Sequence, residues 1–266
     1  MKDPYATDKS DERLAAEEEV LRRFVSDRRW ERMQHVLDQR SRYISVAVED
    51  IYQPHNASAV LRSCDAFGVQ DVHIIENRNR YQVNPGVELG TAQWLSLYRY
   101  RASGFSTAPS TTPISPEGVS EQFAPSASPT TTGTTPSGEG TLEAIGALRA
   151  AGYRIVATTP HRDDVDPDTL PLGDGPIALF FGAEKEGLSE TMLHSADEYL
   201  RIPMRGFVES LNISVSAAVC LNRLGDRLRQ EGHSWRLPRE HRLRILNRWL
   251  RSSVKNAAKI LERELP

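Results

Sequence analysis

The order of predicted strands and helices limits the fold more than any other feature of the sequence. Residues 44–48 form a short β-branched run that predicts a strand. Residues 57–67 predict a helix that ends before Gly68, and residues 72–75 predict a second strand. A strand, a helix and a strand in this order form a βαβ unit, in which the two strands are parallel. The chain is therefore predicted to be an α/β protein with a parallel sheet and helices on both faces.

Strands and helices continue along the chain, with one interruption. Further strands are predicted at 94–100, 153–157, 177–181 and 199–202, and further helices at 142–150 and 190–194. Residues 102–140 are dominated by Ser, Thr, Pro and Gly, so they cannot bury enough apolar surface to offset the entropy of ordering. We interpret this stretch as a disordered insertion, which a sheet can tolerate because the entropy of loop closure grows slowly with length.

Helical segments flank the predicted sheet domain on both sides. Residues 11–39 predict one or two helices, and residues 238–250 and 252–265 predict two more. We divide the chain into an N-terminal helical extension (1–40), a sheet domain (41–230) and a basic C-terminal helical extension (231–266). Residues 201–266 carry 14 Lys and Arg against 6 Asp and Glu, although the whole chain has a net charge of −3. This basic end favours a polyanionic partner, although a solvated helix face is the commoner reason for such a run.

Composition argues against several other classes of protein. Cys64 and Cys220 lie in apolar helical runs without a second Cys or His at ligand spacing, so we expect buried free thiols and no metal site. No window is apolar enough for a membrane span or a signal peptide, so we expect no membrane partner and a cytoplasmic location. The glycine fingerprint G-x-G-x-x-G is absent, which argues against a nucleotide-dependent oxidoreductase on a doubly wound sheet.

Two stretches place polar side chains at the predicted carboxyl edge of the sheet. In P-H-N-A-S-A-V-L-R-S-C-D-A-F-G, residues 54–68, Asn56 lies at the start of a helix and Arg62 follows nearly two turns later. A buried cation is costly, so Arg62 in this largely apolar helix predicts either a carboxylate partner or an anionic substrate. In F-F-G-A-E-K-E-G-L-S, residues 180–189, a buried strand enters a turn that holds Gly182 and Glu184. This edge is where α/β sheets bind ligands, although a plain turn with a solvated carboxylate is the alternative.

A third stretch, residues 199–221, has the sequence Y-L-R-I-P-M-R-G-F-V-E-S-L-N-I-S-V-S-A-A-V-C-L. Ser210 occupies the position expected of a helix N-cap, with Asn212 just beyond it. Nearly every later side chain is apolar or small, so the helix is predicted to be buried on most sides. A capped core helix is the simpler interpretation of this stretch taken alone.

Together, the three stretches resemble the three signature motifs of the SpoU-type RNA 2′-O-methyltransferases, in the order that family uses. The family belongs to the SPOUT superfamily, in which the C-terminal part of the chain is tied into a trefoil knot. The resemblance covers about residues 36–224, without the insertion. The P-H-N and L-R form of the first motif and the helical extensions look most like the TrmH branch, which methylates the ribose of guanosine 18 in the tRNA D-loop.

The resemblance implies a role for individual residues. Arg62 matches the essential arginine of the family, Asn56 its partner and Glu184 the acidic residue of the second motif, while Ser210 and Asn212 match the polar pair beside the methyl donor. S-adenosylmethionine would be held in the knot, largely by backbone atoms near Thr158, Gly182, Ile202 and Leu211. The family also implies a homodimer, formed through the helices that follow Asn56 and Ser210.

The chemistry leaves alternatives open. A ribose hydroxyl is a poor nucleophile until its proton leaves, so a base or a group that stabilises the alkoxide is needed. The family proposal makes a deprotonated Arg62 the base, but a guanidinium stays protonated in proteins, and a phosphate clamp is at least as plausible. Ribosomal RNA is the alternative substrate. A non-catalytic RNA-binding protein of the same fold is disfavoured because all five matching polar residues are intact.

Overall fold

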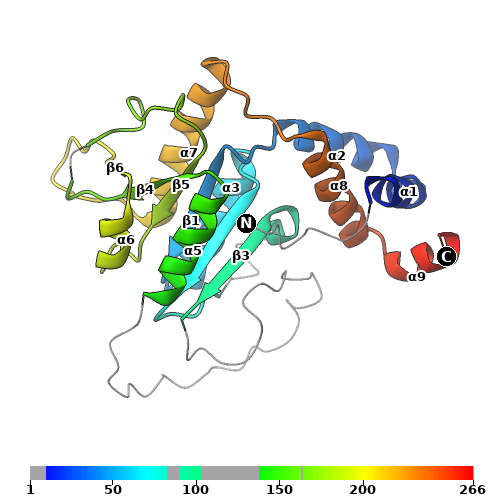
Figure 1. Cartoon of the computed structure of the whole chain (residues 1–266), viewed down its shortest axis with the longest axis horizontal. Coiled ribbons are helices and arrows are strands. Elements are labelled where there is room, and N and C mark those ends of the chain that lie inside the picture. The colour runs from blue at the N-terminus through cyan, green and yellow to red at the C-terminus, as the bar shows by residue number, and fades with distance from the viewer. Residues whose placement is uncertain (1–9, 83–89, 103–137, 163, 266) are drawn as a thin grey trace.

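The computed structural model describes residues 10–82, 90–102, 138–162 and 164–265. At its centre lies a six-stranded sheet with the order β3-β2-β1-β5-β4-β6, in which every neighbouring pair of strands is parallel (Figure 1). The strands are β1 (Ile44–Glu49), β2 (Asp71–Glu76), β3 (Ser96–Arg101), β4 (Arg154–Thr158), β5 (Ile177–Phe181) and β6 (Glu198–Leu200). The predicted parallel α/β fold is confirmed.

Helices cover both faces of the sheet. On one face, α3 (Pro54–Ala66) and α7 (Ile213–Gln230) pack over side chains such as Val46 and Val48. On the other face, α5 (Glu139–Ala150) and α6 (Glu190–Ser195) pack over Ala47 and Phe180. Strands β1, β2 and β5 are buried along their whole length, because helices cover both faces of the sheet. β5 is apolar throughout, whereas β1 and β2 also carry buried polar residues such as Glu49 and His73.

The strand order brings two loops together at the middle of one sheet edge. Because all the strands run in the same direction, their carboxyl ends meet at that edge. The chain goes from β1 outward through β2 and β3, whereas β5, β4 and β6 lie on the other side of β1. The crevice at such a reversal of strand order is where α/β sheets bind ligands. Here it is flanked by residues 50–53, which follow β1, and residues 182–189, which follow β5.

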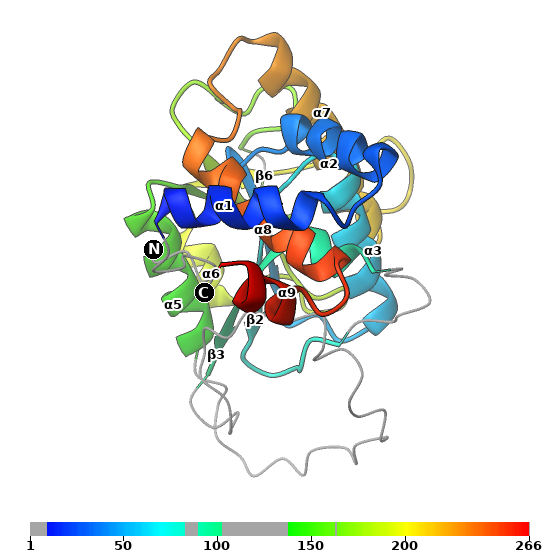
Figure 2. The ribbon, with the colours of Figure 1, turned by 90° about the vertical axis from the view of Figure 1, so that its right-hand side faces the viewer.

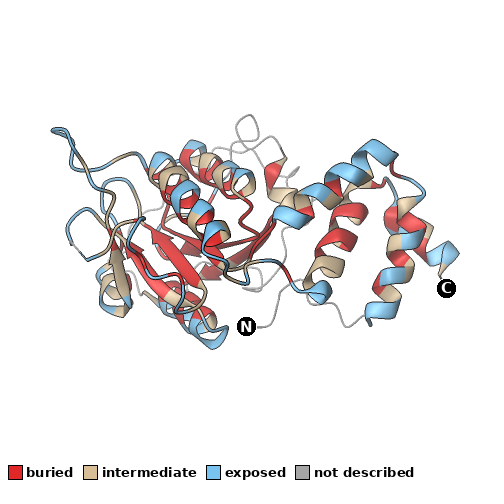
Figure 3. Cartoon of the chain, turned by 90° about the horizontal axis from the view of Figure 1, so that it is seen from above, coloured by how far each residue is buried: buried red, intermediate tan, exposed pale blue. Residues whose placement is uncertain are grey.

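The helices predicted at the two ends of the chain pack against each other. They are α1 (Asp11–Arg22), α2 (Asp27–Gln39), α8 (Arg239–Ser253) and α9 (Ala257–Glu264), and they share one apolar core (Figures 2 and 3). A short 3₁₀ helix, η1 (Thr91–Trp94), joins them to the sheet: Trp249 donates from Nε1 to the carbonyl of Trp94 at 3.0 Å. Across the core, Arg251 forms an ion pair with buried Glu17 at 2.5 Å.

Most of the predicted insertion, residues 103–137, lies outside the described residues. The structured part resumes earlier than predicted, because α5 begins at Glu139 and the Gly140 amide donates to the Asn77 side chain at 3.1 Å. Cys64 and Cys220 are buried free thiols, as predicted. In the described part of the chain, none of the helices has the length and apolar character needed to cross a membrane.

Candidate active site

Asn212 lies at the centre of the polar cluster at this sheet edge. It is the N-cap of α7, where its Oδ1 accepts hydrogen bonds from the amide and the hydroxyl of Ser214 at 2.9 and 2.6 Å. This contact orients the side chain, so Nδ2 points away from the helix. Nδ2 donates one hydrogen bond to Glu184 Oε1 at 2.6 Å and another to Asn56 Oδ1 at 3.2 Å. Both hydrogens of the amide and its acceptor oxygen are therefore used.

The partners of Asn212 come from the two loops at the middle of the sheet. Asn56 is the third residue of α3 and is buried, and its Nδ2 donates to the Gln53 side chain at 3.2 Å. Glu184 is exposed in the turn after β5. That turn doubles back at Gly182, where an added Cβ would lie 2.1 Å from the carbonyl carbon of Gly187. Only glycine fits there, so the turn brings Glu184 over the sheet edge beside Asn212.

Two of the sequence-predicted residues lie elsewhere. Ser210 is not the N-cap of α7: it is exposed, and among the described residues its side chain makes no hydrogen bond. Asn212 takes the cap because the same side chain also reaches Glu184 and Asn56. Arg62 is exposed on the outer side of α3. The cost of burying a cation, from which a carboxylate partner or an anionic substrate was predicted, therefore does not apply to it. Its position was foreseeable, because the buried residues of α3 follow a helical period that leaves Arg62 out: Ala57, Val60, Leu61 and Cys64.

Helix α7 is less buried than predicted. One side packs on the sheet, through residues such as Ala217 and Leu221, but Val215 on its first turn is exposed. Phe207 and Val208, in the loop before the helix, are exposed as well, and so is Tyr52 in the loop after β1. Large exposed apolar side chains mark an interaction surface where they form a contiguous patch.

The four residues expected to hold a methyl donor lie at or just beyond the ends of strands, or just before α7. Thr158 ends β4, Gly182 follows β5, Ile202 follows β6, and Leu211 precedes Asn212. β5, β4 and β6 are neighbours, so their ends share one edge. Between residues 202 and 211 the backbone makes no hydrogen bond to the rest of the described backbone. Most of this loop is exposed, so its N–H and C=O groups can bond to water or to a ligand that is held by main-chain atoms.

A hollow of about 250 Å³ opens beside the cluster. It is lined by both loops and by the turn after β2; its polar residues include Gln53, Asn56, Asn79, Glu184 and Lys185. Sequence reasoning missed Gln53 and Asn79. The available signal was their position just beyond strands β1 and β2, at the carboxyl edge of the sheet. Within the described part of the chain, no group of three or more His, Cys, Asp and Glu residues is placed to hold a metal ion.

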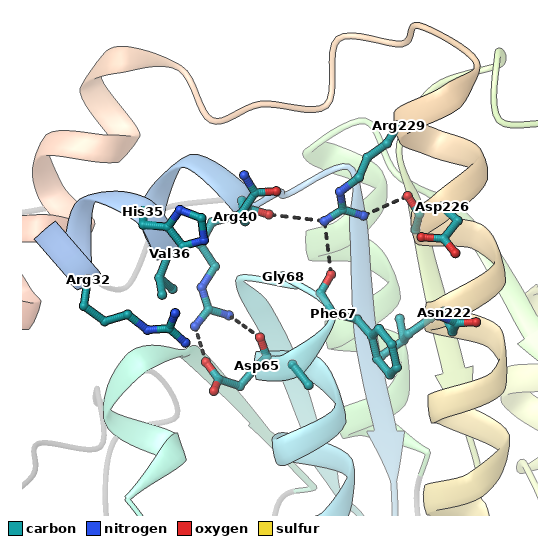
Figure 4. Close-up of a pocket in the computed structure, with 14 residues that line it drawn as sticks. Arg32, His35, Val36, Arg40, Asp65, Phe67, Gly68, Asn222, Asp226 and Arg229 are labelled. Atoms are coloured by element: carbon teal, nitrogen blue, oxygen red, sulfur yellow. Dashed lines mark hydrogen bonds and ion pairs between the residues drawn. The ribbon is translucent and has the colours of Figure 1, made fainter.

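A larger hollow, of about 470 Å³, lies where α2, the end of α3 and α7 meet (Figure 4). Buried Arg40 pairs there with Asp65 and donates to the Val69 carbonyl at 2.9 Å. Arg229 donates to the carbonyl of Gly225 at 2.8 Å and to that of Phe67 at 3.4 Å. Phe67 is the C-cap of α3, so its carbonyl lies at the carboxyl end of a helix, which favours a cation. The hollow contains none of the predicted site residues, and its arginines join the helical extensions to the sheet.

Comparisons with known proteins decide the family. The sequence model of the SpoU rRNA Methylase family matches residues 43–106 and 134–222, more than half of the chain. The chain belongs to the SpoU methylase family. The gap between the two matched segments falls within the predicted insertion, so this stretch is an addition to the part that the family shares.

Individual SpoU relatives match most of the chain. A protein named tRNA (guanosine(18)-2′-O)-methyltransferase from Borreliella burgdorferi is 32% identical over 237 residues, which cover 89% of this chain and 91% of that protein. The protein of the same name from Thermus thermophilus is 32% identical over 196 residues, 74% of this chain and 81% of its own. The crystal structure of the A. aeolicus TrmH/SpoU tRNA modifying enzyme has a TM-score of 0.64 at 22% identity, covering 86% of this chain and 98% of that chain. That structure shares the fold.

Proposed function

We propose that this protein transfers a methyl group from S-adenosylmethionine to the 2′-hydroxyl of a ribose in RNA, and that the target is guanosine 18 in the D-loop of tRNA. The observation that carries the proposal is the contact of Asn212 with both Glu184 and Asn56, made by three separate motifs of a SpoU methylase. The relatives that match 89% and 74% of this chain are named for this tRNA reaction, which favours tRNA over ribosomal RNA.

The bound donor supplies an electrophilic methyl group, so the protein has to orient the acceptor and place charge. Asn212 holds Glu184 at a fixed point of the sheet edge, next to the hollow where an acceptor ribose would lie. Arg62 is exposed, and we propose that it binds a phosphate of the RNA. A guanidinium that grips the adjacent phosphate in a bidentate pair holds the ribose in line and favours loss of the hydroxyl proton. We prefer this role for Arg62 to that of a base, because its guanidinium keeps its proton.

We further propose that the residues around Thr158, Gly182, Ile202 and Leu211 hold the donor, and that the chain here forms the trefoil knot of the superfamily. The unpaired backbone of residues 202–211 supports main-chain recognition of the donor. Ser210 has no partner among the described residues, which leaves its hydroxyl available to the donor or the acceptor.

A homodimer accounts for the exposed apolar side chains near the site. Tyr52, Phe207, Val208 and Val215 border the Asn56–Asn212 contact along the chain, and a second copy packed on α3 and α7 would cover them. Arg62 lies on the exposed side of α3 and points away from the helix's own core, which suits a role in the partner's site. The two buried thiols suit a cytoplasmic protein.

We assign RNA binding to the helical extensions, proposed above as units separate from the sheet domain. Helix α2 exposes Arg28, Arg29 and Arg32, and phosphate contacts of this kind supply affinity that falls with salt. Truncation is a poor test of this role, because removal of α8 would strip Trp249 and Leu250 from the core that covers α1 and α2. Replacing Arg28 and Arg32 together should weaken tRNA binding and lower its salt dependence, and leave S-adenosylmethionine binding unchanged.

Methyl transfer from a labelled donor to unmodified tRNA and to ribosomal RNA tests the function. The expected product is tRNA methylated on the ribose of guanosine 18, with no label transferred by an Arg62→Ala variant. Label in ribosomal RNA alone would move the substrate to the alternative. RNA binding without any transfer by the wild-type protein would show a non-catalytic RNA-binding protein.

A further inference from the structure

Glu49, the last residue of β1, is a buried carboxylate without a cation partner among the described residues. Its side chain is 1% exposed. Oε2 accepts a hydrogen bond from the amide of Ser189 at 2.8 Å. Oε1 accepts from the Ser189 hydroxyl at 2.8 Å and from the Thr141 hydroxyl at 2.5 Å. Three neutral donors therefore satisfy a charge that lies in the middle of the sheet edge.

Burial of the Glu49 carboxylate without a cation partner in the described structure is unusual because of its cost in free energy. Burying a carboxylate carries a large desolvation cost, and hydrogen bonds offset it only when every donor is in place. The neighbouring carboxylate, Glu76 at the end of β2, is equally buried but pairs with Arg101 at 2.6 Å and with Arg99 at 3.6 Å. The stability of a buried carboxylate that has only neutral donors depends more strongly on the positions of those donors than the stability of one paired with arginines.

The donors of Glu49 belong to segments that shape the active site. Ser189 ends the turn that carries Glu184, and it is also the N-cap of α6. The turn leaves β5 at Gly182 and closes on itself through the Gly187 amide, which donates to the Ala183 carbonyl at 2.8 Å. Glu49 fixes its far end. Because Glu184 lies between these two anchors, its position over Asn212 depends on both.

We propose that Glu49 is a positioning residue for the methyl transfer: it holds residues 182–189 in place and thereby keeps Glu184 in contact with Asn212. Through its hydrogen bond to Thr141, Glu49 also contacts the first turn of α5. The Thr141 hydroxyl accepts a further hydrogen bond from Asn77 at 2.8 Å. The inference rests on the proposed function, since it assigns Glu49 to the geometry of that reaction. Glu49 is not among the residues that line the hollow beside the Asn212 cluster.

Glu49→Gln tests the proposal with almost no change in shape. The glutamine oxygen can replace Oε1 and keep both hydroxyl partners, but its amide then faces the Ser189 amide, donor against donor. Glu76→Gln is the matched control, because it alters an equally buried carboxylate on the next strand whose hydrogen bonds and ion pairs go to Tyr81, Arg99 and Arg101 and not to residues 182–189. Hydrogen–deuterium exchange of residues 182–189, kcat, the KM for RNA and the thermal midpoint are measured for both variants.

We expect Glu49→Gln to speed amide exchange in residues 182–189 and to lower kcat on the order of 10- to 100-fold, the effect of a small misplacement in an active site. Glu76→Gln should leave exchange in this turn and kcat near wild type, whatever it does to the thermal midpoint. Unchanged exchange in Glu49→Gln, or equal losses of kcat in both variants, would overturn the positioning role. Wild-type protein that transfers no methyl group to RNA would instead refute the proposed function, and the exchange data would still report whether Glu49 holds the turn.

Discussion

Asn212→Asp replaces one amide nitrogen with oxygen at the centre of the cluster. Aspartate caps helices as well as asparagine does, so the contact with Ser214 should survive and the helix should keep its start. The second oxygen of the new carboxylate would then face Glu184 at the 2.6 Å now spanned by a hydrogen bond. It would also face the Asn56 oxygen, which has lost its donor.

The size of the effect follows from these contacts. Two unit charges at this distance repel by about 1.6 kcal/mol even with the dielectric of bulk water, which is the appropriate limit for exposed groups. Loss of a hydrogen bond to a charged acceptor adds roughly 1.5 kcal/mol or more. Together these terms disfavour the wild-type arrangement by about 3 kcal/mol, which corresponds to roughly a 100-fold loss of kcat if the arrangement is needed for transfer.

Asn212→Asp should therefore lower activity without lowering stability. Glu184 is exposed and can turn into solvent, so the thermal midpoint of Asn212→Asp should stay near wild type, whereas Asn212→Ala loses the cap and about 1 kcal/mol. Lowering the pH from about 8 to about 5.5 should restore part of the rate of Asn212→Asp, because one carboxyl of the pair becomes protonated and can donate again. Methyl transfer to tRNA across this pH range, with calorimetry of all three proteins, provides the test. Near-normal kcat in Asn212→Asp at pH 8 would refute the role given to this contact.

Three further outcomes are expected. Arg62→Lys keeps the charge but loses the bidentate fork, so kcat/KM for RNA should fall roughly 10-fold while donor affinity is unchanged; complete inactivity would favour Arg62 as the base. Gly182→Ala would force a Cβ against Gly187, so donor affinity and thermal midpoint should both drop, and wild-type values for both would contradict the tight turn. Burial, and secondarily the charge of Arg42, lower the pKa of His73 from 6.5 to about 3. Below pH 6.5 the unfolded chain therefore binds a proton at His73 that the folded chain does not, and the free energy of unfolding should fall by about 2 kcal/mol between pH 7 and pH 5. Urea unfolding at the two pH values should show a smaller loss in His73→Phe than in the wild type. An equal loss in both proteins would refute this role of His73.

The sequence alone determined the layered architecture of the protein. The β-branched runs and the Gly68 stop predicted β1, α3 and β2 to within a few residues, because local propensity and tertiary packing favour the same structure there. The parallel sheet followed from that order. The motifs also placed Asn56, Glu184 and Asn212 at the ends of strands or the start of a helix, and the structure brings these three side chains into contact; their roles in catalysis stay predictions.

Only the tertiary structure decided which polar side chain caps α7. Ser210 and Asn212 are both good caps, and their spacing does not choose between them. The choice depends on Glu184 and Asn56, which reach Asn212 from other segments of the chain. The donors around Glu49 were equally hidden from sequence reasoning, because Thr141 and Ser189 are 92 and 140 residues away along the chain.

The two helical extensions show the same limit on a larger scale. Each was predicted as a separate helical extension of the sheet domain. In the folded protein, α1 and α2 pack against α8 and α9, and the Arg251–Glu17 pair links residues 234 positions apart. Local sequence determines where a helix forms and which side of it is apolar. Which distant segment covers that side depends on the path of the whole chain, so only the folded structure could decide it.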